Sequence, residues 1–533
     1  MEESNKNPIL PIPGQRNIPV TSALPYVNNV PHLGNLTGSV LSADVFTRYC
    51  RARGVNTLYV CDPRIKEGIA PQELCDKYHS IHKDIYTWFN ISFDVFGRTT
   101  TEQQTSITHD IYLKLLENGY LKEESTTQLF CPKQEHNSFL ADRFVEGICP
   151  HCGYGGAHED QCDVHGTAPV TKKTKHIFLE LDKLQPQIEE FVAQSSSNGQ
   201  CITRDMKWGT PVSTPPSLSG YEEKVIYAWF DACIGYISII ATYTEQWSKW
   251  WRDPDNVRLY QFLGKDNVAY HTVIFPGSLI GTEEKWTKLH HLSTTDYLTY
   301  EGEKFSKSRG AGVFGDSAKK TGISSDVWRY YLLPRRPESG DTELKWDAFL
   351  SAKNNILLKN LGNLVSRVVK FLNSKHYNGV VPNYSEYQDE DGLAVRLRSG
   401  LTTALATSQK GNAFLQSLNL SSKLAELNPV KCTAAIGFAA NLLHLIAAMI
   451  EPYMPETAGG IIPDVRRADS IKPGHVVREA KYLFSNIKVE KAEEWRRKGK
   501  KEIAEGKTST KEEDERMRSS RRDRVEKEKA VWK

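Results

Sequence analysis

The sequence predicts an α/β fold with a doubly wound parallel sheet, followed by a helical region. The first observation is VTSALPYVNNVPHLGN at 20–35, where a run of strand-forming residues meets a turn and then a helix. The second is NTLYVC at 56–61, a further buried strand after the helix expected at 39–53. The third is a strand at 259–263 that runs into Gly264. Ligands of such sheets bind at the carboxyl ends of the strands.

The turn at 20–35 has the residue types of a phosphate site. A strand, a turn and a helix start place unpaired N–H groups and the positive end of the helix dipole together. Gly34 allows a nucleotide to approach the backbone, and His32 can donate to a phosphoryl oxygen. A polar turn that enters an amphipathic helix is the other interpretation, because a short motif alone decides neither.

The run KFSKSRG at 304–310 places Lys304 and Lys307 three residues apart in a loop rich in Ser and Gly. Two such lysines form a cationic clamp suited to a triphosphate. Taken alone, a run of this kind is more often a solvated charged loop.

The two motifs together, HLGN and KFSKS, resemble the paired signature motifs of the class I aminoacyl-tRNA synthetases. The segments ALPYVNN (23–29), KVIYAWFDACIGYISI (224–239) and FLGKDNVAYHTVIFPG (262–277) are similar to methionyl-tRNA synthetases of the eukaryotic cytosolic kind. The resemblance extends from 18 to about 487. It implies a Rossmann-like catalytic domain with a zinc-knuckle connective insertion, followed by an all-α anticodon-binding bundle.

The resemblance divides the chain into six segments. They are a loose arm (1–17), the first half of the catalytic domain (18–120), the connective insertion (121–215), the second half with the KFSKS loop (216–335), the linker and anticodon-binding domain (336–487) and a charged flexible tail (488–533). The periodicity also predicts helical structure across 70–119 and a buried, Ala- and Leu-rich helix at 434–452.

The family's reaction gives each matching residue an expected role. Methionine is activated by ATP with Mg²⁺ to methionyl-adenylate, which is transferred to tRNA(Met). The catalytic residues would be His32, Asn35, Lys304 and Lys307; ATP would contact Gly34, Gly264, Asp266, Ser306 and Arg204; methionine would contact Tyr26, Trp229, Ala232, Tyr236, His271 and Asp62; the anticodon would contact Asn363 and Arg367.

The residue types fit a methionine pocket, because aromatic rings make favourable contacts with a thioether sulfur. For any single aromatic residue, ordinary core packing is the commoner reading. His271, on an expected apolar strand, would by itself be interpreted as a core histidine with satisfied hydrogen bonds. Arg204 has a structural ion pair as its alternative.

The chain departs from the family pattern after Cys61. The family continues there with an acidic residue that anchors the methionine amino group, whereas this chain reads Cys61-Asp62-Pro63 and reaches the next Glu-Gly turn early. Asp62 is the expected substitute for the missing acid, although Pro63 fixes a turn directly after it. The alternative function is therefore a catalytically impaired synthetase-like form that binds tRNA or partner proteins.

A zinc site is expected in the insertion. Cys131, His136, Cys149 and Cys152 form the pattern C-x4-H followed by C-x-x-C. Two thiolates facing a Cys/His pair close a tetrahedral structural Zn²⁺ site, although a C-x-x-C alone is a weak signal. A second knuckle near Cys162 is incomplete, so a second zinc is not expected.

Composition and charge limit the expected partners and location of the protein. The formal net charge of +3 over 533 residues leaves RNA binding to local patches. No apolar run approaches the ~20 residues that span a bilayer, and no presequence is evident, so the expected location is the cytoplasm without membrane contact. Other synthetases or a tRNA-binding cofactor protein are further expected partners. A class I synthetase for Val, Ile, Leu or Cys is the third interpretation; those for Val, Ile and Leu carry larger editing insertions.

Overall fold

The computed structural model describes residues 7–23, 30–61, 71–131, 138–139, 145–147, 157–162, 170–189, 200–205, 209–213, 220–303, 305, 312–383, 397–461, 471–477 and 482–497. These residues belong to two compact units. The first unit comprises Met1–Asn29, Val55–Ser80 and Phe93–Ser293, and the second comprises Val30–Gly54, Ile81–Ser92 and Thr294–Lys533. Each unit is described by itself.

The first unit is built on a sheet with the strand order β13-β12-β1-β2-β3. Its strands are β1 (Asn17–Ser22), β2 (Asn56–Cys61), β3 (Val95–Phe96), β12 (Leu259–Gly264) and β13 (Leu289–Thr295). β1 pairs in parallel with both β12 and β2, and β2 pairs in parallel with β3. Every residue of β1 is buried, as expected for a central strand covered on both faces. The α/β prediction and the strands at 56–61 and 259–263 are confirmed.

One helix, α6 (Ala228–Tyr243), packs on β2 and β3 of this sheet. The other helices of the first unit are α4 (Glu102–Glu117), α5 (Leu181–Glu189), α7 (Ser248–Trp251) and α8 (Phe275–Ile280), with a 3₁₀ turn η3 (Lys265–Asn267) and a π-helical turn η4 (Tyr270–Ile274). The helix α3 (Pro71–Trp88) has residues in both units. The continuous helical region predicted for 70–119 is wrong in one respect, because β3 separates α3 from α4. The backbone N–H of Tyr59 donates to the Asp94 carboxylate at 2.7 Å, which holds the chain beside β2 just before β3.

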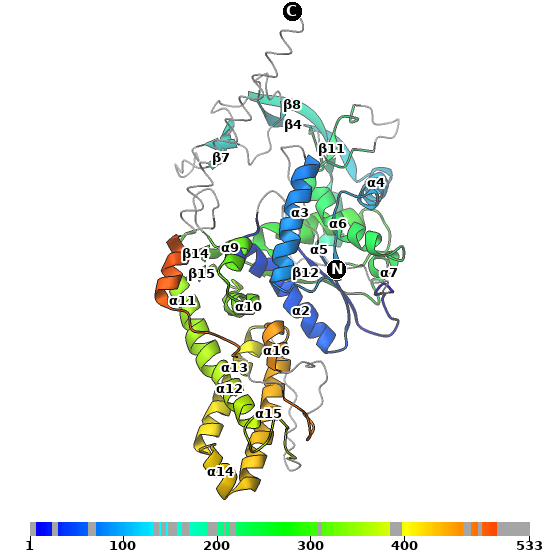
Figure 1. Cartoon of the computed structure of the whole chain (residues 1–533). Helices are drawn as coiled ribbons and strands as arrows, with labels where there is room; N and C mark the ends of the chain where they lie inside the picture. Colours follow the sequence, from blue (N-terminus) through cyan, green and yellow to red (C-terminus); the bar gives the residue numbers. More distant parts are fainter. Residues whose placement is uncertain are drawn as a thin grey trace, which may run out of the picture. The chain divides into compact units, whose positions relative to one another are not determined.

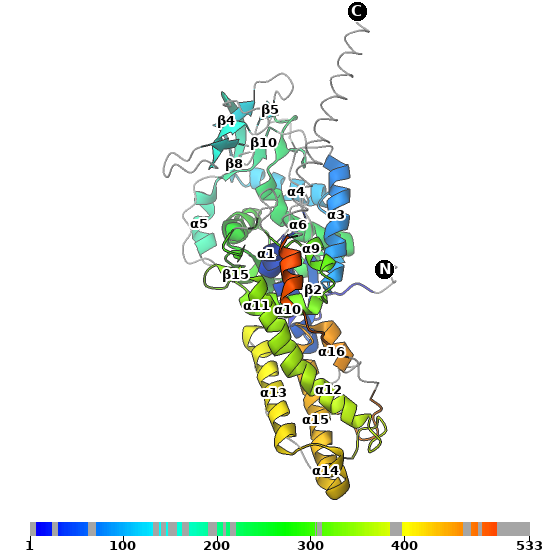
Figure 2. The ribbon, with the colours of Figure 1, turned by 60° about the vertical axis from the view of Figure 1, so that its left-hand side comes forward.

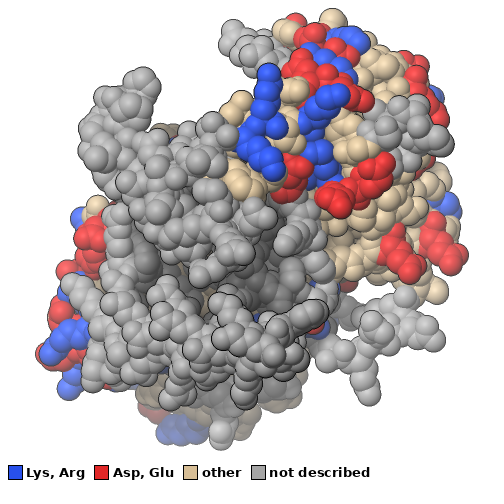
Figure 3. Space-filling view, turned by 90° about the horizontal axis from the view of Figure 1, so that it is seen from above, with Lys and Arg blue, Asp and Glu red and all other residues tan. Residues whose placement is uncertain are grey.

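The insertion contributes a separate antiparallel sheet with the order β5-β4-β8-β9. Its strands are β4 (Leu121–Cys131), β5 (Ser138–Phe139), β8 (Val170–Leu179) and β9 (Gln200–Cys201), and a short pair is formed by β6 (Val145–Gly147) with β7 (Ala157–Cys162). A second pair joins β10 (Thr203–Arg204) of the insertion to β11 (Val225–Ile226), which follows the insertion. Figure 3 shows Lys and Arg intermingled with Asp and Glu on the described part of the face seen from above. This mixture agrees with the nearly neutral net charge of +3.

The second unit begins with one continuous helical run. It consists of α1 (Leu33–Asn35), the π-helical η1 (Leu36–Val40) and α2 (Leu41–Ala52). The helix predicted for 39–53 therefore starts earlier, directly after His32. The unit also holds β14 (Leu298–Tyr300), which pairs in parallel with β15 (Thr342–Leu344), and the helices α9 (Gly315–Lys320), α10 (Ser325–Leu332), η5 (Leu333–Arg335) and α11 (Trp346–Ser351).

A helical bundle completes the second unit. Its helices are η6 (Ala352–Gly362), α12 (Asn363–Leu372), α13 (Leu397–Ser417), α14 (Ser422–Leu427), α15 (Pro429–Ile450) and α16 (Pro455–Ile461). α12, α13 and α15 lie side by side in both ribbon views (Figures 1 and 2). Among the described helices, α15 alone is long and apolar enough to cross a membrane by length and composition. The expectation that no apolar stretch approaches the length of a membrane span therefore does not hold for α15, of whose apolar stretch half is buried.

Candidate active site

His32 is the N-cap of the helix that starts at Leu33. Its Nδ1 accepts a hydrogen bond from the Asn35 backbone N–H at 3.2 Å, and its own N–H donates to the Asn35 Oδ1 at 3.2 Å. This reciprocal pair satisfies two backbone donors that a helix start leaves open. Two residues predicted to hold ATP therefore form one local structure, with Gly34 between them.

The ring of His32 contacts two phenylalanines of the second unit. Phe305 stacks on it with ring centroids 4.7 Å apart and 15° between the planes, and Phe314 meets it edge-on at 6.4 Å. Phe305 belongs to KFSKS, so the two signature motifs are in contact. Lys304, Ser306 and Lys307 lie outside the described residues. No motif or spacing marked Phe314, an ordinary apolar residue, as part of this site.

Burial lowers the pKa of His32 to about 4, so the ring is neutral at physiological pH. Because Nδ1 accepts from Asn35, the single ring proton is on Nε2. A Cβ at Gly34 would come within 2.9 Å of the His32 Nδ1, so the glycine is required by the position of the ring itself. The arrangement leaves a neutral donor at the helix start, where an anion binds favourably.

In the first unit, β12 ends at Gly264 as predicted. A Cβ placed on Gly264 would meet nothing within 4 Å, so the space above this backbone is open. Asp266 follows in the turn η3 and is exposed to solvent. The carboxyl end of this strand therefore offers an approachable backbone and a carboxylate to a ligand.

Tyr236 and His271 form a buried hydrogen-bonded pair in the same unit. Their Oη and Nε2 atoms are 2.9 Å apart, and the His271 Nδ1 is 2.8 Å from the Asn267 carbonyl oxygen. A carbonyl accepts only, so Nδ1 carries the proton and the Tyr236 hydroxyl donates to Nε2. The strand predicted around His271 is wrong. The residue lies in the helical turn η4, because a short apolar run fits either period.

The buried His271 makes stability depend on pH. Burial lowers its pKa to about 4, so between pH 6.5 and 4 the unfolded chain binds a proton that the folded chain does not. The free energy of unfolding therefore falls as the pH falls through this window, by about 3 kcal/mol for this residue. Urea unfolding at pH 7 and pH 4.5 should show a smaller difference for His271→Gln than for the unchanged protein. An equal difference in both proteins would contradict the assignment.

The other residues predicted to contact methionine are only partly described. Ala232 is buried on α6, next to Cys233, whose Sγ is 3.8 Å from the His271 Nε2. Trp229 lies on α6, but its side chain is not among those that the structure describes. Tyr26 and Asp62 lie outside the described residues.

Arg204 is held by neighbours within the first unit. Its guanidinium lies 3.9 Å from the centroid of the Tyr227 ring, and its Nη1 donates to the Cys201 Sγ at 2.8 Å. Contact of Arg204 with the triphosphate stays a prediction.

The four predicted zinc ligands fall outside what the structure describes. Cys131 ends β4, but its side chain is not described, and His136, Cys149 and Cys152 lie outside the described residues.

The predicted anticodon pair lies on α12, as its four-residue spacing required. Asn363 is exposed, and its amide donates to the Lys359 carbonyl at 2.8 Å. Arg367 donates to the Asn412 carbonyl of α13 at 3.3 Å. Arg367 thus contacts α13, one of the two helices that line a groove of about 480 Å³.

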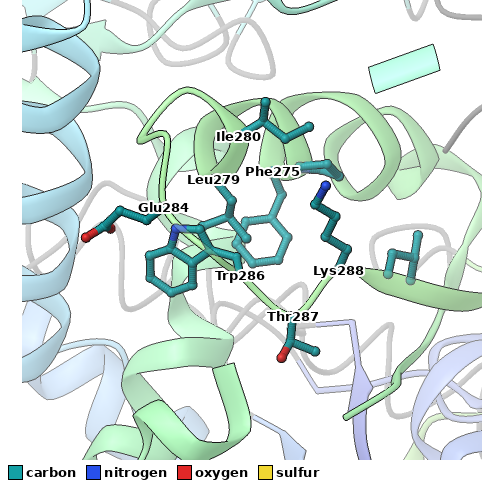
Figure 4. A pocket seen from close by; sticks show the side chains of 9 residues that line it. Phe275, Leu279, Ile280, Glu284, Trp286, Thr287 and Lys288 are labelled. Atoms are coloured by element: carbon teal, nitrogen blue, oxygen red, sulfur yellow. The ribbon is translucent and has the colours of Figure 1, made fainter. Parts of the chain in front are cut away.

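A cavity between α8 and β13 is too small for a substrate. Its volume is about 20 Å³, room for one water molecule. Phe275, Leu279 and Trp286 line it, and the Glu284 carboxylate points away from it (Figure 4).

Comparison with known proteins decides the family. The profile of the family "tRNA synthetases class I (M)" matches residues 18–369. The probable cytoplasmic methionine–tRNA ligase of Schizosaccharomyces pombe is 48% identical, over 92% of this chain and 72% of the relative. The cytoplasmic methionine–tRNA ligase of Saccharomyces cerevisiae is 47% identical, over 92% and 74% respectively. The chain belongs to the class I methionyl-tRNA synthetases.

The fold agrees with that of solved methionyl-tRNA synthetases. The Mycobacterium tuberculosis methionyl-tRNA synthetase in complex with methionyl-adenylate superposes with a TM-score of 0.68, 20% identity, and coverage of 88% of this chain and 100% of that chain. The names of both yeast relatives place those proteins in the cytoplasm, in agreement with the expected location.

The alignment also shows that this synthetase is shortened. It extends over 569 residues with the Schizosaccharomyces pombe relative, although the whole chain has only 533. The relative therefore contains segments that this chain lacks. That one of the missing segments would follow Cys61, where the sequence departs from the family pattern, stays a prediction.

Proposed function

We propose that this chain is a cytoplasmic methionine–tRNA ligase, which activates methionine with ATP and transfers it to the 3′ end of tRNA(Met). The observation that carries the proposal is the 48% identity to a methionine–tRNA ligase over 92% of the chain. By the same reasoning, segments 18–120 and 216–335 provide the catalytic domain, and 336–487 provides the linker and the anticodon-binding bundle.

In the proposed reaction, the methionine carboxylate attacks the α-phosphorus of ATP, giving methionyl-adenylate and pyrophosphate. The protein positions the reactants and stabilises charge on the phosphate oxygens. The His32 Nε2–H, at a helix N-terminus, would donate to the triphosphate, and Asn35 holds the ring in place. Lys304 and Lys307, which flank Phe305 in the KFSKS motif, would neutralise the charge of the triphosphate.

The remaining ATP contacts and the metals follow from residue chemistry. We assign the ribose hydroxyls to Asp266, with Gly264 allowing close approach. Mg²⁺ neutralises phosphate charge and is usually held by phosphate oxygens together with one or two carboxylates. The thiolate and imidazole donors Cys131, His136, Cys149 and Cys152 fit a structural Zn²⁺.

The Tyr236–His271 pair is proposed to contact methionine, and Tyr236→Phe tests this. The variant removes the hydroxyl that donates to the His271 Nε2. The KM for methionine should rise about tenfold, the equivalent of roughly 1.4 kcal/mol, with a smaller change in kcat. Tyr243→Phe, whose hydroxyl accepts from the Ile9 backbone N–H, is the matched control. An unchanged KM in both variants would exclude Tyr236 from the pocket.

We assign tRNA binding to the groove between α13 and α15. Its lining combines Lys410 and Lys431 with Phe414 and Phe438, whose rings meet edge-on at 5.1 Å. Unpaired bases are bound by stacking on aromatic rings near positive charge. Arg367 contacts α13, and Asn363 lies four residues before it on α12, so we propose that an unpaired tRNA base enters here.

Phe438→Ala tests the groove. Loss of one stacking ring should raise the Kd for tRNA(Met) about tenfold. Leu445→Ala, which removes an exposed apolar side chain from the same helix outside the lining, is the control. Equal effects of the two variants would place the tRNA elsewhere.

Aminoacylation measures the function itself. The protein should attach methionine to tRNA(Met) and should not attach valine, isoleucine, leucine or cysteine to their tRNAs. Attachment of one of these four instead would overturn the methionine assignment.

The shortened sequence favours one second candidate. Because relatives carry segments that this chain lacks, the chain is alternatively an impaired form that binds tRNA or partner proteins, such as other synthetases or a tRNA-binding cofactor protein. Binding of tRNA(Met) without charging would support this candidate.

A further inference from the structure

Two exposed arginines of the first unit lie at the starts of neighbouring strands. Arg16 directly precedes β1 and Arg258 directly precedes β12, and these two strands pair in parallel. The Arg258 backbone N–H donates to the Asn17 carbonyl at 3.0 Å, which holds the two strand starts together. Gly264, the candidate ATP contact, is at the other end of β12, roughly 20 Å away along an extended strand.

An aromatic ring and two histidines complete this cluster. The Arg16 Nη2 donates to the Tyr260 hydroxyl at 2.7 Å. His290 and His291, on the neighbouring strand β13, have ring centroids 5.4 and 5.3 Å from that of Tyr260. Both histidines are exposed, whereas Tyr260 is largely buried. We call Arg16, Arg258, Tyr260, His290 and His291 the basic edge of the sheet.

The arginines of the basic edge have no acidic partner in the described part of the chain. Neither Arg16 nor Arg258 forms an ion pair with a described residue. By contrast, Arg98 of the same unit pairs with Asp76 at 2.5 Å. Partial burial, together with the charges of Arg258 and Arg16, lowers the pKa of His290, so this histidine lies in a positive field. An uncompensated cationic cluster of this kind favours an anionic ligand.

Phosphate groups of an RNA backbone fit the chemistry of the basic edge. The planar fork of an arginine binds phosphate oxygens through two N–H donors, and basic side chains beside an aromatic ring are typical of nucleic-acid surfaces. The net charge of +3 leaves RNA binding to local patches, and the chain belongs to a family of tRNA synthetases.

We propose that the basic edge binds the phosphate backbone of tRNA, without regard to base sequence. Contacts to phosphates hold an RNA in place and carry no sequence information. Because the basic edge is at the opposite end of β12 from Gly264, it contributes to the affinity for tRNA and not to the chemistry. The inference rests on the proposed function, because it requires that tRNA is a substrate of this protein.

The salt dependence of tRNA binding tests the proposal. Each phosphate contact adds roughly 0.7–0.9 to the slope of the logarithm of the binding constant against the logarithm of salt concentration. The double variant Arg16→Gln with Arg258→Gln should therefore reduce this slope by roughly 1.5 in magnitude. The reduction should be equal for tRNA(Met) and for an unrelated tRNA. Fluorescence anisotropy with labelled tRNA over a series of salt concentrations measures it.

Two further double variants separate a phosphate contact from a structural role. Arg98→Gln with Arg252→Gln removes the same two charges at arginines that are already paired with carboxylates, so it should leave the slope unchanged. Arg16→Lys with Arg258→Lys keeps both charges and should also keep the slope. A merely structural role would lower thermal stability in Arg16→Gln with Arg258→Gln and leave the slope as it was, which would overturn the proposal.

Two other results would also contradict a backbone contact. One is a change of slope that is confined to tRNA(Met). The other is an unchanged slope for tRNA together with binding of a polyglutamate peptide that requires Arg16 and Arg258, because the ligand would then be an acidic protein segment.

The outcomes also distinguish this proposal from the proposed function. Methionine-dependent ATP–pyrophosphate exchange needs no tRNA and should be the same in the glutamine variant and in the unchanged protein. If the protein charges tRNA(Met) and the slope does not change, the proposal for the basic edge is wrong and the ligase assignment stands. If the slope changes and tRNA(Met) is not charged, the basic edge binds RNA and the ligase assignment is wrong.

Discussion

His32→Asn is expected to reduce methionine-dependent ATP–pyrophosphate exchange by about 10²–10³-fold, the usual cost of removing one donor from a developing charge. Asparagine is a good N-cap, so the helix that starts at Leu33 should be retained. The variant thus removes the Nε2–H donor and the stacking on Phe305, but not the helix start. Steady-state exchange kinetics at saturating ATP and methionine measure the effect.

The pH profile gives this prediction a second readout. The neutral His32, with its pKa lowered to about 4, should show no break in exchange activity near pH 6.5. His109→Gln, which changes a histidine whose Nε2 is 2.7 Å from the Pro211 carbonyl oxygen, is the control and should retain activity. A loss below threefold for His32→Asn, or a break near pH 6.5 that His32→Asn abolishes, would rule out a neutral His32 donor.

Arg329→Met is expected to destabilise the protein by about 3–5 kcal/mol, because it removes one partner of a fully buried ion pair. Asp44 keeps Arg48 as its charged partner but loses its fully buried one. The carbonyls of Phe89, Pro452 and Tyr453 lose their donor. Urea unfolding followed by circular dichroism measures the change.

The double variant Asp44→Asn with Arg329→Met tests the mechanism. It removes both charges, so it should be more stable than Arg329→Met alone. Arg335→Met, on a partly exposed arginine, should cost about 1 kcal/mol or less. Equal losses of unfolding free energy in Arg329→Met and Arg335→Met would mean that burial of the Arg329–Asp44 pair adds nothing to stability.

The sequence was sufficient for features with local signals. The buried strands at 56–61 and 259–263, the helix after His32 and the shared face of Asn363 and Arg367 all follow from short-range periodicity. Two errors have the same origin, because short segments fit more than one period: β3 has only two residues, and the apolar run at His271 is helical.

Long-range contacts were out of reach of that reasoning. The stacking of Phe305 on His32 and the pairing of Arg329 with Asp44 join residues more than 270 positions apart. Charged residues on amphipathic helices are usually exposed, so nothing local marked Arg329 or Asp44 as buried. The family resemblance predicted that the motifs act together, but only the fold shows which atoms meet.

The most direct test of the ligase assignment is methionine-dependent ATP–pyrophosphate exchange by the chain as it stands, beside a form that carries the relatives' segment after Cys61. We expect exchange that requires methionine in both proteins. Activity in the extended form alone would support the impaired alternative. Absence of exchange from both proteins, with folding verified, would contradict the ligase assignment.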